Sequence, residues 1–336
     1  MMRVGIIGLG MMGRTHYEAY QELADIAQVT AVSDVDPRRA AGDLSGTGGN
    51  VLAGGLSKLP MDRIKGTTNY RELLSMSDVD VVDICLPTTQ HVEIATAALQ
   101  SGKHVLCEKP LARTSAEGQQ IADAARGAKG FFMPAMCMRF WPQWAWLKQA
   151  VSEGRYGKVF SATFRRVASM PAGWYKDGKM SGGAALDLHI HDTDFVQYLF
   201  GMPRAVTSRG YTKTSGEVDH LTTQFHYDNV PHVIAEGGWA YTDGFGFSMR
   251  YTVNFETATA DFDLAREQPL LLIENGKSTP VDAGPGHGYT AELRYFLTCV
   301  RSKQRPTVVT AEDGVRSLQL VEAEVKSVRS GETVQL

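Results

Sequence analysis

Two hydrophobic patterns alternate along the first 135 residues of the chain. Short apolar runs predict strands, and these runs occupy residues 3–8, 27–34, 79–86, 104–108 and 131–135. Stretches of helical composition lie between them, at residues 11–23, 36–44, 90–103 and 115–128. Strands that alternate with helices are typical of βαβ units. The sequence therefore predicts an α/β fold that begins with a Rossmann-type, doubly wound parallel sheet.

The pattern changes after Ala135. Residues 140–154 predict an amphipathic helix, and β-rich runs follow at 158–168, 204–212, 219–227, 230–241, 246–256, 258–265 and 269–275. One face of a predicted strand carries Phe245, Phe247, Met249, Tyr251, Val253 and Phe255. Helices are expected at 288–302 and 311–328. We therefore expect two domains, at residues 1–134 and 135–336, the second an α+β domain with a large, mostly antiparallel sheet.

Composition excludes several classes of protein. The formal net charge of -3 and the 21% of charged residues give no sign of a nucleic-acid-binding surface, and no apolar run is long enough to span a bilayer. The cysteines are widely spaced, at Cys85, Cys107, Cys137 and Cys299, so we expect free thiols and a cytoplasmic protein. Residues 45–58 are rich in glycine, which predicts a surface insertion.

A glycine-rich turn follows the first predicted strand. Gly8, Gly10 and Gly13 form a G-x-G-x-x-G pattern, with Met11 and Met12 at the start of the next helix. This pattern alone is weak, because glycines also mark ordinary turns. Between a strand and a helix of a βαβ unit, it predicts a turn that binds the pyrophosphate of a dinucleotide at the helix N-terminus.

Asp34 ends the second predicted strand, about twenty residues after the last glycine of the turn. A carboxylate at this place binds the ribose hydroxyls and repels a 2′-phosphate, so we expect NAD in preference to NADP. Two alternatives stay open: Asp34 is a helix cap, or Arg38 and Arg39 hold a phosphate.

The stretch "CEKP" ends another apolar strand on charged residues. The carboxyl ends of parallel strands face the ligand crevice, so Glu108 and Lys109 should emerge at the edge where the cofactor binds. Pro110 restricts the backbone directly after the lysine. The alternative is that both charges are ordinary solvated groups at a strand end.

The stretch "GGAALDLHIHDTDFVQYLF" combines carboxylates with histidines. On a helix, Asp187, His191 and Asp194 share one face, and His189 points roughly the opposite way. A carboxylate beside a histidine suits a general base that works near neutral pH. A buried histidine without a chemical role is the main alternative. A metal would need His189 and His191 aligned on a strand, so we expect none.

Together these motifs resemble the Gfo/Idh/MocA oxidoreductases, the group that contains glucose–fructose oxidoreductase and the inositol dehydrogenases. The resemblance covers essentially the whole chain. It rests on "GKHVLCEKPLA", on "GGAALDLHIHDTD", on "LPTTQH", and on the shorter matches "RFWP" and "EDG".

The resemblance implies roles for individual residues. Lys109, Asp187 and His191 would form the catalytic group. Further cofactor contacts would come from Leu86, Pro87, His91 and Glu108. A polyhydroxylated substrate would contact the catalytic group together with Arg139, Trp174 and Tyr175. The chain departs from the family pattern at His189 and Ala184, which replace glycines, at Cys137, where many members have asparagine, and at Tyr175, where arginine is common.

The leading interpretation is thus an NAD(P)-dependent dehydrogenase or reductase of a sugar or cyclitol. A redox-assisted glycosidase on the same scaffold is one alternative, and a non-catalytic NAD- or sugar-binding sensor is another. The resemblance further implies a homo-oligomer, dimeric or tetrameric, that associates through the C-terminal sheet.

Overall fold

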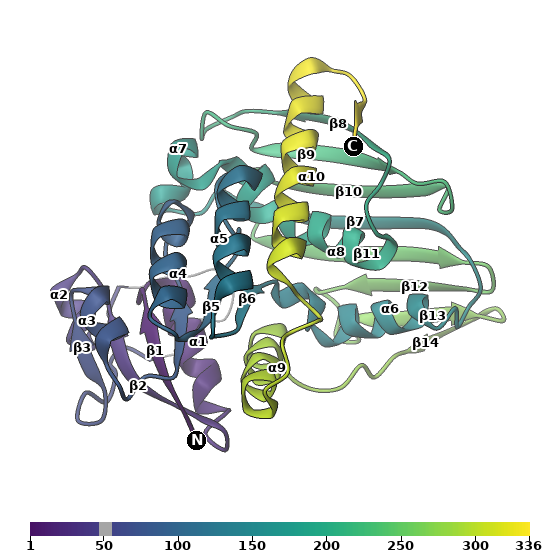
Figure 1. Cartoon of the computed structure of the whole chain (residues 1–336). Coiled ribbons are helices and arrows are strands. Elements are labelled where there is room, and N and C mark those ends of the chain that lie inside the picture. The colour runs from purple at the N-terminus through teal and green to yellow at the C-terminus, as the bar shows by residue number, and fades with distance from the viewer. Residues whose placement is uncertain (47–55) are drawn as a thin grey trace. The chain divides into compact units, whose positions relative to one another are not determined.

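In the computed structural model, residues 1–46 and 56–336 are described, and they form two compact units (Figure 1). The first unit contains Met1–Phe140 and His287–Val315, and the second contains Trp141–Gly286 and Arg316–Leu336. Most of the predicted insertion at 45–58 lies outside the described residues. No helix in the described part of the chain is long and apolar enough to cross a membrane.

The first unit is built on a six-stranded sheet whose order is β3-β2-β1-β4-β5-β6, with every pairing parallel. Its strands are β1 Met2–Ile7, β2 Ala27–Ser33, β3 Lys65–Thr67, β4 Val81–Ile84, β5 His104–Glu108 and β6 Phe132–Ala135. Strands β2 and β3 are added on one side of β1, and β4, β5 and β6 are added on the other. The order of the strands therefore reverses between β1 and β4, and a doubly wound sheet binds its ligand at such a switch point.

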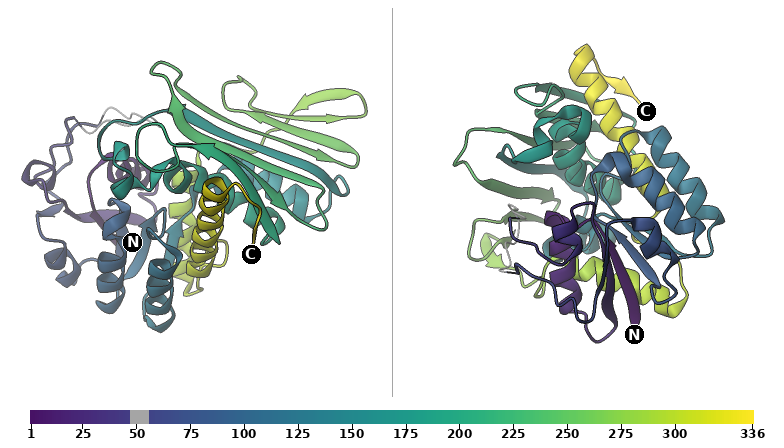
Figure 2. Two further views of the ribbon diagram at one scale, coloured as in Figure 1. Left: turned by 90° about the horizontal axis from the view of Figure 1, so that it is seen from above. Right: turned by 90° about the vertical axis from the view of Figure 1, so that its left-hand side faces the viewer.

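Helices cover both faces of this sheet (Figure 2). The longer ones are α1 Met11–Gln21, α4 His91–Gln100, α5 Ser115–Gly127 and α9 Gly288–Ser302, and the shorter ones are α2 Pro37–Ala40 and α3 Tyr70–Ser75. Helix α4 packs beside α5, and α9 packs beside α1. The apolar face of α9 buries Leu293, Phe296 and Leu297 in the same core as Val4 and Ile6 of β1.

The two units differ from the predicted domains, which were separated by a single boundary between residues 134 and 135. The first unit extends through Phe140 and recruits a segment from the C-terminal half of the sequence. The physical reason is that the apolar side chains of α9 complete the core against α1.

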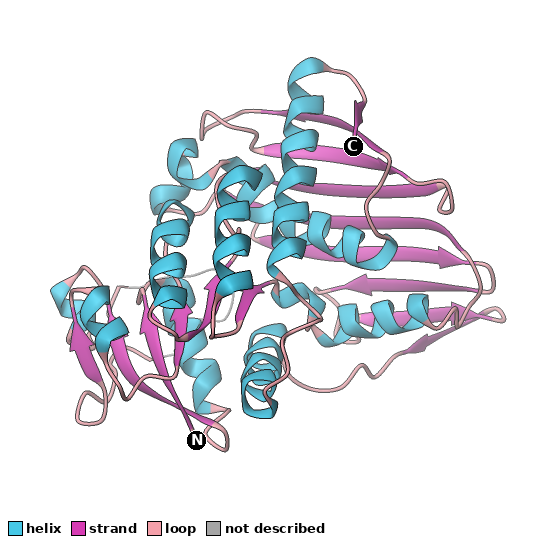
Figure 3. Ribbon diagram, viewed as in Figure 1, coloured by secondary structure: helices cyan, strands magenta, loops and turns pink. Residues whose placement is uncertain are grey.

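The second unit contains a nine-stranded sheet of order β14-β13-β12-β11-β7-β10-β9-β8-β15 (Figure 3). Its strands are β7 Val159–Ser169, β8 Ala205–Tyr211, β9 His220–His226, β10 His232–Tyr241, β11 Phe247–Phe255, β12 Ala258–Asp263, β13 Leu270–Glu274, β14 Lys277–Pro280 and β15 Val334–Gln335. The β7–β10 pair is parallel, and the other pairs are antiparallel. The prediction of a large, mostly antiparallel sheet is confirmed.

One face of this sheet is covered by helices, and among the described residues no helix covers the other (Figure 2, left view). The covering helices are α6 Pro142–Ser152, α8 Ile190–Phe200 and the C-terminal part of α10 Ala311–Ser330. Strand β11 shows the same difference between the two faces of the sheet. Met249, Tyr251 and Val253 are buried on the covered face, and the residues between them are exposed. Phe245 is the exception to the predicted face, since it precedes β11 and is exposed.

The helix predicted around "ALDLHIHDTD" is present, but it begins with an irregular turn. Residues Ala185–His189 form a π-helical turn, and α8 follows directly from Ile190. His189 is fully buried in this turn, and a Cβ on Gly237 of β10 would come within 2.3 Å of its ring. Glycine at 237 therefore leaves the space that His189 occupies.

Strand β7 and helix α8 are joined by a buried ion pair. Arg166 Nε lies 2.9 Å from Asp192 Oδ2, and its Nη2 lies 3.2 Å from Oδ1. Both residues are almost completely buried. Because the two charges are removed from water together, the arrangement depends on both partners being present.

His104 at the start of β5 gives the first unit a pH dependence. The backbone N–H of Phe131 donates to His104 Nδ1 at 3.0 Å, so this nitrogen must be unprotonated. Burial lowers the pKa of His104 below its ordinary value of 6.5. Below about pH 6.5 the unfolded chain binds a proton that the folded chain resists, so stability should fall as the pH falls.

We expect His104→Asn to weaken that pH dependence, because an asparagine carbonyl oxygen can accept the same N–H without titrating. Thermal unfolding at pH 7.5 and pH 5.5 measures the effect. The wild-type midpoint should fall more between these pH values than that of the variant. An equal fall in the two proteins would contradict this role for His104.

Candidate active site

The turn between β1 and α1 is shaped by its glycines, each for a different reason. Gly8 has a φ of +94°, and a Cβ there would lie 2.4 Å from the Cys85 carbonyl oxygen. A Cβ on Gly13 would lie 1.9 Å from the Gly8 carbonyl oxygen. A Cβ on Gly10 would meet nothing within 4 Å. The fold itself thus needs Gly8 and Gly13, whereas Gly10 leaves open space.

That open space lies at the N-terminus of α1, where backbone N–H groups are available to an anion. Gly10 is the N-cap, and no side chain in the described part of the chain caps the helix there. The first turn has no acidic residue; Met11 and Met12, which begin it, are both partly buried. A pyrophosphate fits these features, because it would fill the space above Gly10 and accept from the free N–H groups.

Gly10 and Gly13 offer a direct test of this interpretation. Gly10→Ala should fold normally, yet it should weaken NAD binding by tenfold or more, because the methyl group would occupy the space for the pyrophosphate. Gly13→Ala should lower the thermal midpoint, because the methyl group overlaps a backbone carbonyl. Calorimetric titration with NAD and thermal unfolding measure the two effects. Unchanged NAD affinity in Gly10→Ala would contradict a pyrophosphate site here.

Asp34 is placed directly after β2 and is fixed by several contacts. Its Oδ2 accepts from the Leu9 N–H at 2.8 Å, which ties it to the glycine-rich turn. Its Oδ1 accepts from the Asp36 N–H and from Arg39 Nη2. The N-cap of α2 is Asp36, so Asp34 is not the helix cap. Its position beside the turn suits the ribose carboxylate that the sequence predicts.

Of the two arginines after Asp34, only Arg39 reaches that carboxylate, at 2.8 Å. Arg38 is exposed and pairs with Asp36 at 3.2 Å. The structure therefore places Arg38 away from Asp34, and a cofactor contact from Arg38 remains a prediction.

His91 connects the loops that follow β4 and β5. Its Nε2 lies 2.9 Å from the Leu86 carbonyl oxygen, and its Nδ1 lies 2.8 Å from the Pro110 carbonyl oxygen. The ring is completely buried, and this burial lowers its pKa. His91 thus holds Leu86 and Pro87 against the loop that carries Lys109, so its influence on a bound cofactor would be through their position.

Lys109 follows the last residue of β5 and is partly buried. Its backbone N–H donates to Glu108 Oε2 at 3.0 Å. The Lys109–Pro110 peptide bond is cis. Glu108 is almost completely buried, so it is not a solvated charge at a strand end. Strand β5 thus ends at Glu108, and Lys109 follows it at the carboxyl edge of the parallel sheet. A cofactor contact from either residue remains a prediction.

The other predicted catalytic residues belong to the second unit. Asp187 lies in the π-helical turn and His191 in the first turn of α8, and both are partly buried. The π-helical turn changes the spacing assumed for a regular helix. π-Helical turns of this kind are common at functional sites.

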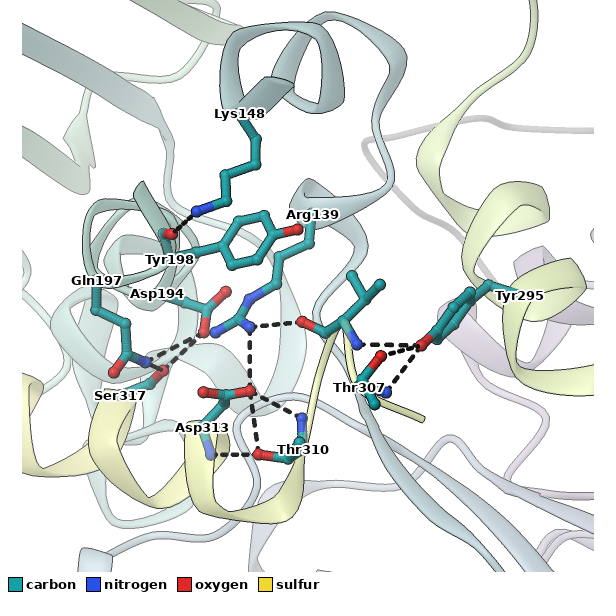
Figure 4. A network of polar contacts seen from close by, with 11 residues as sticks. Arg139, Lys148, Asp194, Gln197, Tyr198, Tyr295, Thr307, Thr310, Asp313 and Ser317 are labelled. Atoms are coloured by element: carbon teal, nitrogen blue, oxygen red, sulfur yellow. Dashed lines mark hydrogen bonds and ion pairs between the residues drawn. The ribbon is translucent and has the colours of Figure 1, made fainter. Parts of the chain in front are cut away.

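Asp194, the third polar residue of the predicted face, has a structural partner. It is almost completely buried and accepts from Ser317 Oγ at 2.8 Å (Figure 4). Gln197 also donates to Ser317 Oγ, at 2.6 Å. These contacts join α8 to α10 within the second unit.

Trp174 and Tyr175 form a stacked pair in the same unit, with ring centroids 4.1 Å apart. Both rings are partly buried. Tyr175 packs edge-on against Trp239, in a small cluster that also contains Leu188 of the π-helical turn. The pair is therefore partly core and partly accessible, and its predicted role in substrate binding stays open.

Arg139 differs from its predicted role in substrate binding. Its side chain is 2% exposed, and Nη1 donates to the Val308 carbonyl oxygen at 2.7 Å and lies 3.2 Å from Asp313 Oδ2 (Figure 4). A Cβ on Gly314 would come within 2.9 Å of Leu111. The short motifs "RFWP" and "EDG" are thus in contact through Arg139 and Asp313. Gly314 of "EDG" also packs against Leu111, which follows "CEKP".

The fold and the glycine-rich turn define a dinucleotide-binding protein of the Rossmann class. Family models match residues 2–136, as the NAD-binding Rossmann domain of an oxidoreductase family, and residues 148–336, as the C-terminal α/β domain of that family. The chain belongs to the Gfo/Idh/MocA oxidoreductase family.

Individual relatives agree with this assignment. Myo-inositol 2-dehydrogenase of Thermotoga maritima is 28% identical over 100% of this chain and 98% of its own length. The NAD(+)-dependent scyllo-inositol 2-dehydrogenase of Bacillus subtilis is 26% identical over 100% of this chain and 96% of its own. A solved levoglucosan dehydrogenase in complex with NADH and levoglucosan superposes with a TM-score of 0.85, at 22% identity, over 99% of both chains.

Proposed function

We propose that this protein is an NAD-dependent dehydrogenase that oxidises a secondary alcohol of a sugar or cyclitol, or reduces the matching ketone. The observation that carries the proposal is the open position at Gly10, at the uncapped N-terminus of α1 and beside the carboxylate of Asp34. The names of the relatives support the substrate class, because they include dehydrogenases of inositols. NAD supplies the hydride acceptor when it is bound.

The proposed chemistry assigns one task to each polar residue. His191 takes the proton of the substrate hydroxyl as a general base. The ammonium group of Lys109 donates a hydrogen bond to the oxygen that becomes negatively charged. Asp187 orients these groups. For reduction of a ketone, His191 returns the proton and Lys109 polarises the carbonyl oxygen.

The first experiment is a substrate screen with the purified protein. NAD is incubated with myo-inositol, scyllo-inositol, levoglucosan, free sugars and aryl glycosides, and NADH absorbance is followed. A dehydrogenase forms one NADH for each ketone produced. A redox-assisted glycosidase would instead release the aryl alcohol with no net NADH, and a sensor would bind NAD or sugar without turnover. Either outcome would replace the proposal.

NAD should also bind more tightly than NADP. Asp34 places a negative charge where the 2′-phosphate of NADP would lie, if the ribose binds as in other Rossmann domains. Calorimetric titration with the two cofactors compares their affinities. Tighter binding of NADP would imply that Arg39 leaves Asp34 and pairs with the phosphate.

We further propose a cytoplasmic homo-oligomer that associates through the sheet of the second unit. The support is the sheet face that no helix covers in the described residues. Light scattering at micromolar concentration tests this part separately, and a monomer would contradict it.

A further inference from the structure

A group of four ionisable side chains lies in the interior of the first unit, and the chemistry above assigns it no task. His16 comes from α1, Asp83 from β4, Glu108 from β5 and Glu292 from α9. Their exposed fractions are 0%, 0%, 4% and 0%. Three carboxylates and one imidazole thus share a site that water does not reach.

One side of the imidazole is fixed by hydrogen bonds. His16 Nδ1 lies 2.9 Å from Asp83 Oδ2, and Tyr20 donates to the same oxygen at 3.0 Å. This pair sets the orientation of the ring and directs Nε2 the other way. Metal-binding histidines commonly have such a carboxylate on the nitrogen that does not bind the metal.

The other side of the imidazole faces two carboxylates. His16 Nε2 lies 3.1 Å from Glu108 Oε1, yet this contact does not have the geometry of a hydrogen bond. Both oxygens of Glu292 lack a hydrogen-bond partner among the described residues. One ligand atom from each of His16, Glu108 and Glu292 lies within 4.8 Å of the other two.

These carboxylates need a positive charge or a proton. Glu292 is completely buried, and one of its carboxylate oxygens lies within 4.8 Å of a carboxylate oxygen of Glu108. A buried carboxylate with no partner is strongly unfavourable. Two atoms that bind the same metal ion, each about 2.1 Å from it, lie about 3–3.4 Å apart and do not point at each other. The contact between His16 Nε2 and Glu108 Oε1 has this separation without hydrogen-bond geometry, which favours an ion over a proton.

We infer that His16 Nε2, Glu108 and Glu292 bind one divalent transition-metal ion, with Asp83 orienting the histidine. The combination of one imidazole and two carboxylates suits Zn²⁺ or Mn²⁺, and it is less suited to Ca²⁺ or Mg²⁺, which take oxygen ligands. The ion would join α1, β5 and α9. It would also neutralise Glu108, whose Oε2 accepts the Lys109 N–H. This site is separate from the stretch that contains Asp187, His189 and His191, where we expect no metal.

Metal content and metal titration test this inference on the full-length protein. The chain as purified, and the chain stripped with EDTA and reloaded with Zn²⁺ or with Mn²⁺, should each contain one ion per chain by mass spectrometry. Reloading should raise the thermal midpoint, since an ion that binds the folded state stabilises it. If the purified chain holds no ion, and the stripped chain takes up neither Zn²⁺ nor Mn²⁺, the inference is overturned and a proton neutralises the cluster.

Variants locate the ion. Glu292→Gln keeps the shape of the side chain and should weaken Zn²⁺ binding at least a hundredfold in calorimetry. Asp83→Asn should weaken it by about 10–100-fold, because Asp83 acts through the histidine. Asp123→Asn, which alters an exposed carboxylate of α5, is the matched control and should bind normally. Zn²⁺ binding that is the same in wild type, Glu292→Gln and Asp83→Asn would place the ion elsewhere and refute the site. If Glu292→Gln does not fold, Asp83→Asn and the wild-type stoichiometry decide.

Discussion

Lys109→Ala should lower turnover by about 10²–10³-fold while leaving NAD affinity nearly unchanged. A charged donor directed at a developing alkoxide in a site without water is worth about 3–4 kcal/mol of the barrier, by analogy with removal of one oxyanion-hole donor. The glycine-rich turn and Asp34 lie on other strand ends, so they should still bind NAD. Steady-state kinetics on the substrate found in the screen, together with NAD titration, separates the two effects.

His191→Ala should also lower turnover, by about a hundredfold or more, through loss of the proton acceptor. If Lys109 and His191 act on the same oxygen, the double variant should be little worse than the poorer single one. The pH profile of the wild type should show an ionisation near neutrality that His191→Ala lacks. Lys129→Ala removes an exposed lysine of the first unit and serves as the control. Full activity of Lys109→Ala would show that this lysine is only a charge at a strand end.

Arg166→Leu should destabilise the protein by about 3–5 kcal/mol, because it leaves the buried carboxylate of Asp192 without its partner. The neighbouring Arg165 provides a matched control. It points to the opposite face of the sheet, where it pairs with Glu236 and is 30% exposed, so Arg165→Leu should cost about 1 kcal/mol or less.

Chemical denaturation of the two arginine variants measures the difference. A double variant, Arg166→Leu with Asp192→Leu, should recover part of the loss, since an apolar pair can replace a buried ion pair at little cost. Equal stability of Arg165→Leu and Arg166→Leu would mean that the buried pair contributes no more than the exposed one.

The regular parts of the fold could be predicted from the sequence because each has a clear hydrophobic period. Buried parallel strands such as "HVLC" and "VVDI" are almost continuous apolar runs, although Asp83 interrupts the second, and β11 alternates because one of its faces is covered. Strands β3, β14 and β15 were not predicted. They are short and mostly exposed, so their formation depends on pairing with a neighbour and not on their own pattern.

Other features depend on contacts between distant residues, which spacing does not reveal. The apolar face of α9 could be read from the sequence, but not that it packs on α1. The π-helical turn at Ala185–His189 has the composition of an ordinary helix, and the glycine that makes room for His189 lies on β10.

The candidate site shows the same limit. The glycine-rich turn and Asp34 could be singled out because their spacing follows from the geometry of a βαβ unit. Arg139 was assigned to the substrate, but it is buried against Asp313, a partner far along the chain. His16 and Glu292 were not singled out at all. Histidine within "GRTHYEAY" and glutamate within "GYTAELRYF" resemble ordinary helix residues until the fold brings them together.

The most direct test of the proposed function follows the hydride itself. A substrate from the screen is labelled with deuterium at the carbon that bears the reacting hydroxyl, and the cofactor is analysed by mass spectrometry after turnover. We predict that deuterium accumulates in reduced NAD, in equal amount to the ketone formed. Two results would contradict the assignment as a dehydrogenase. One is formation of the ketone without deuterium in the cofactor. The other is return of the deuterium to a product whose glycosidic bond has been cleaved.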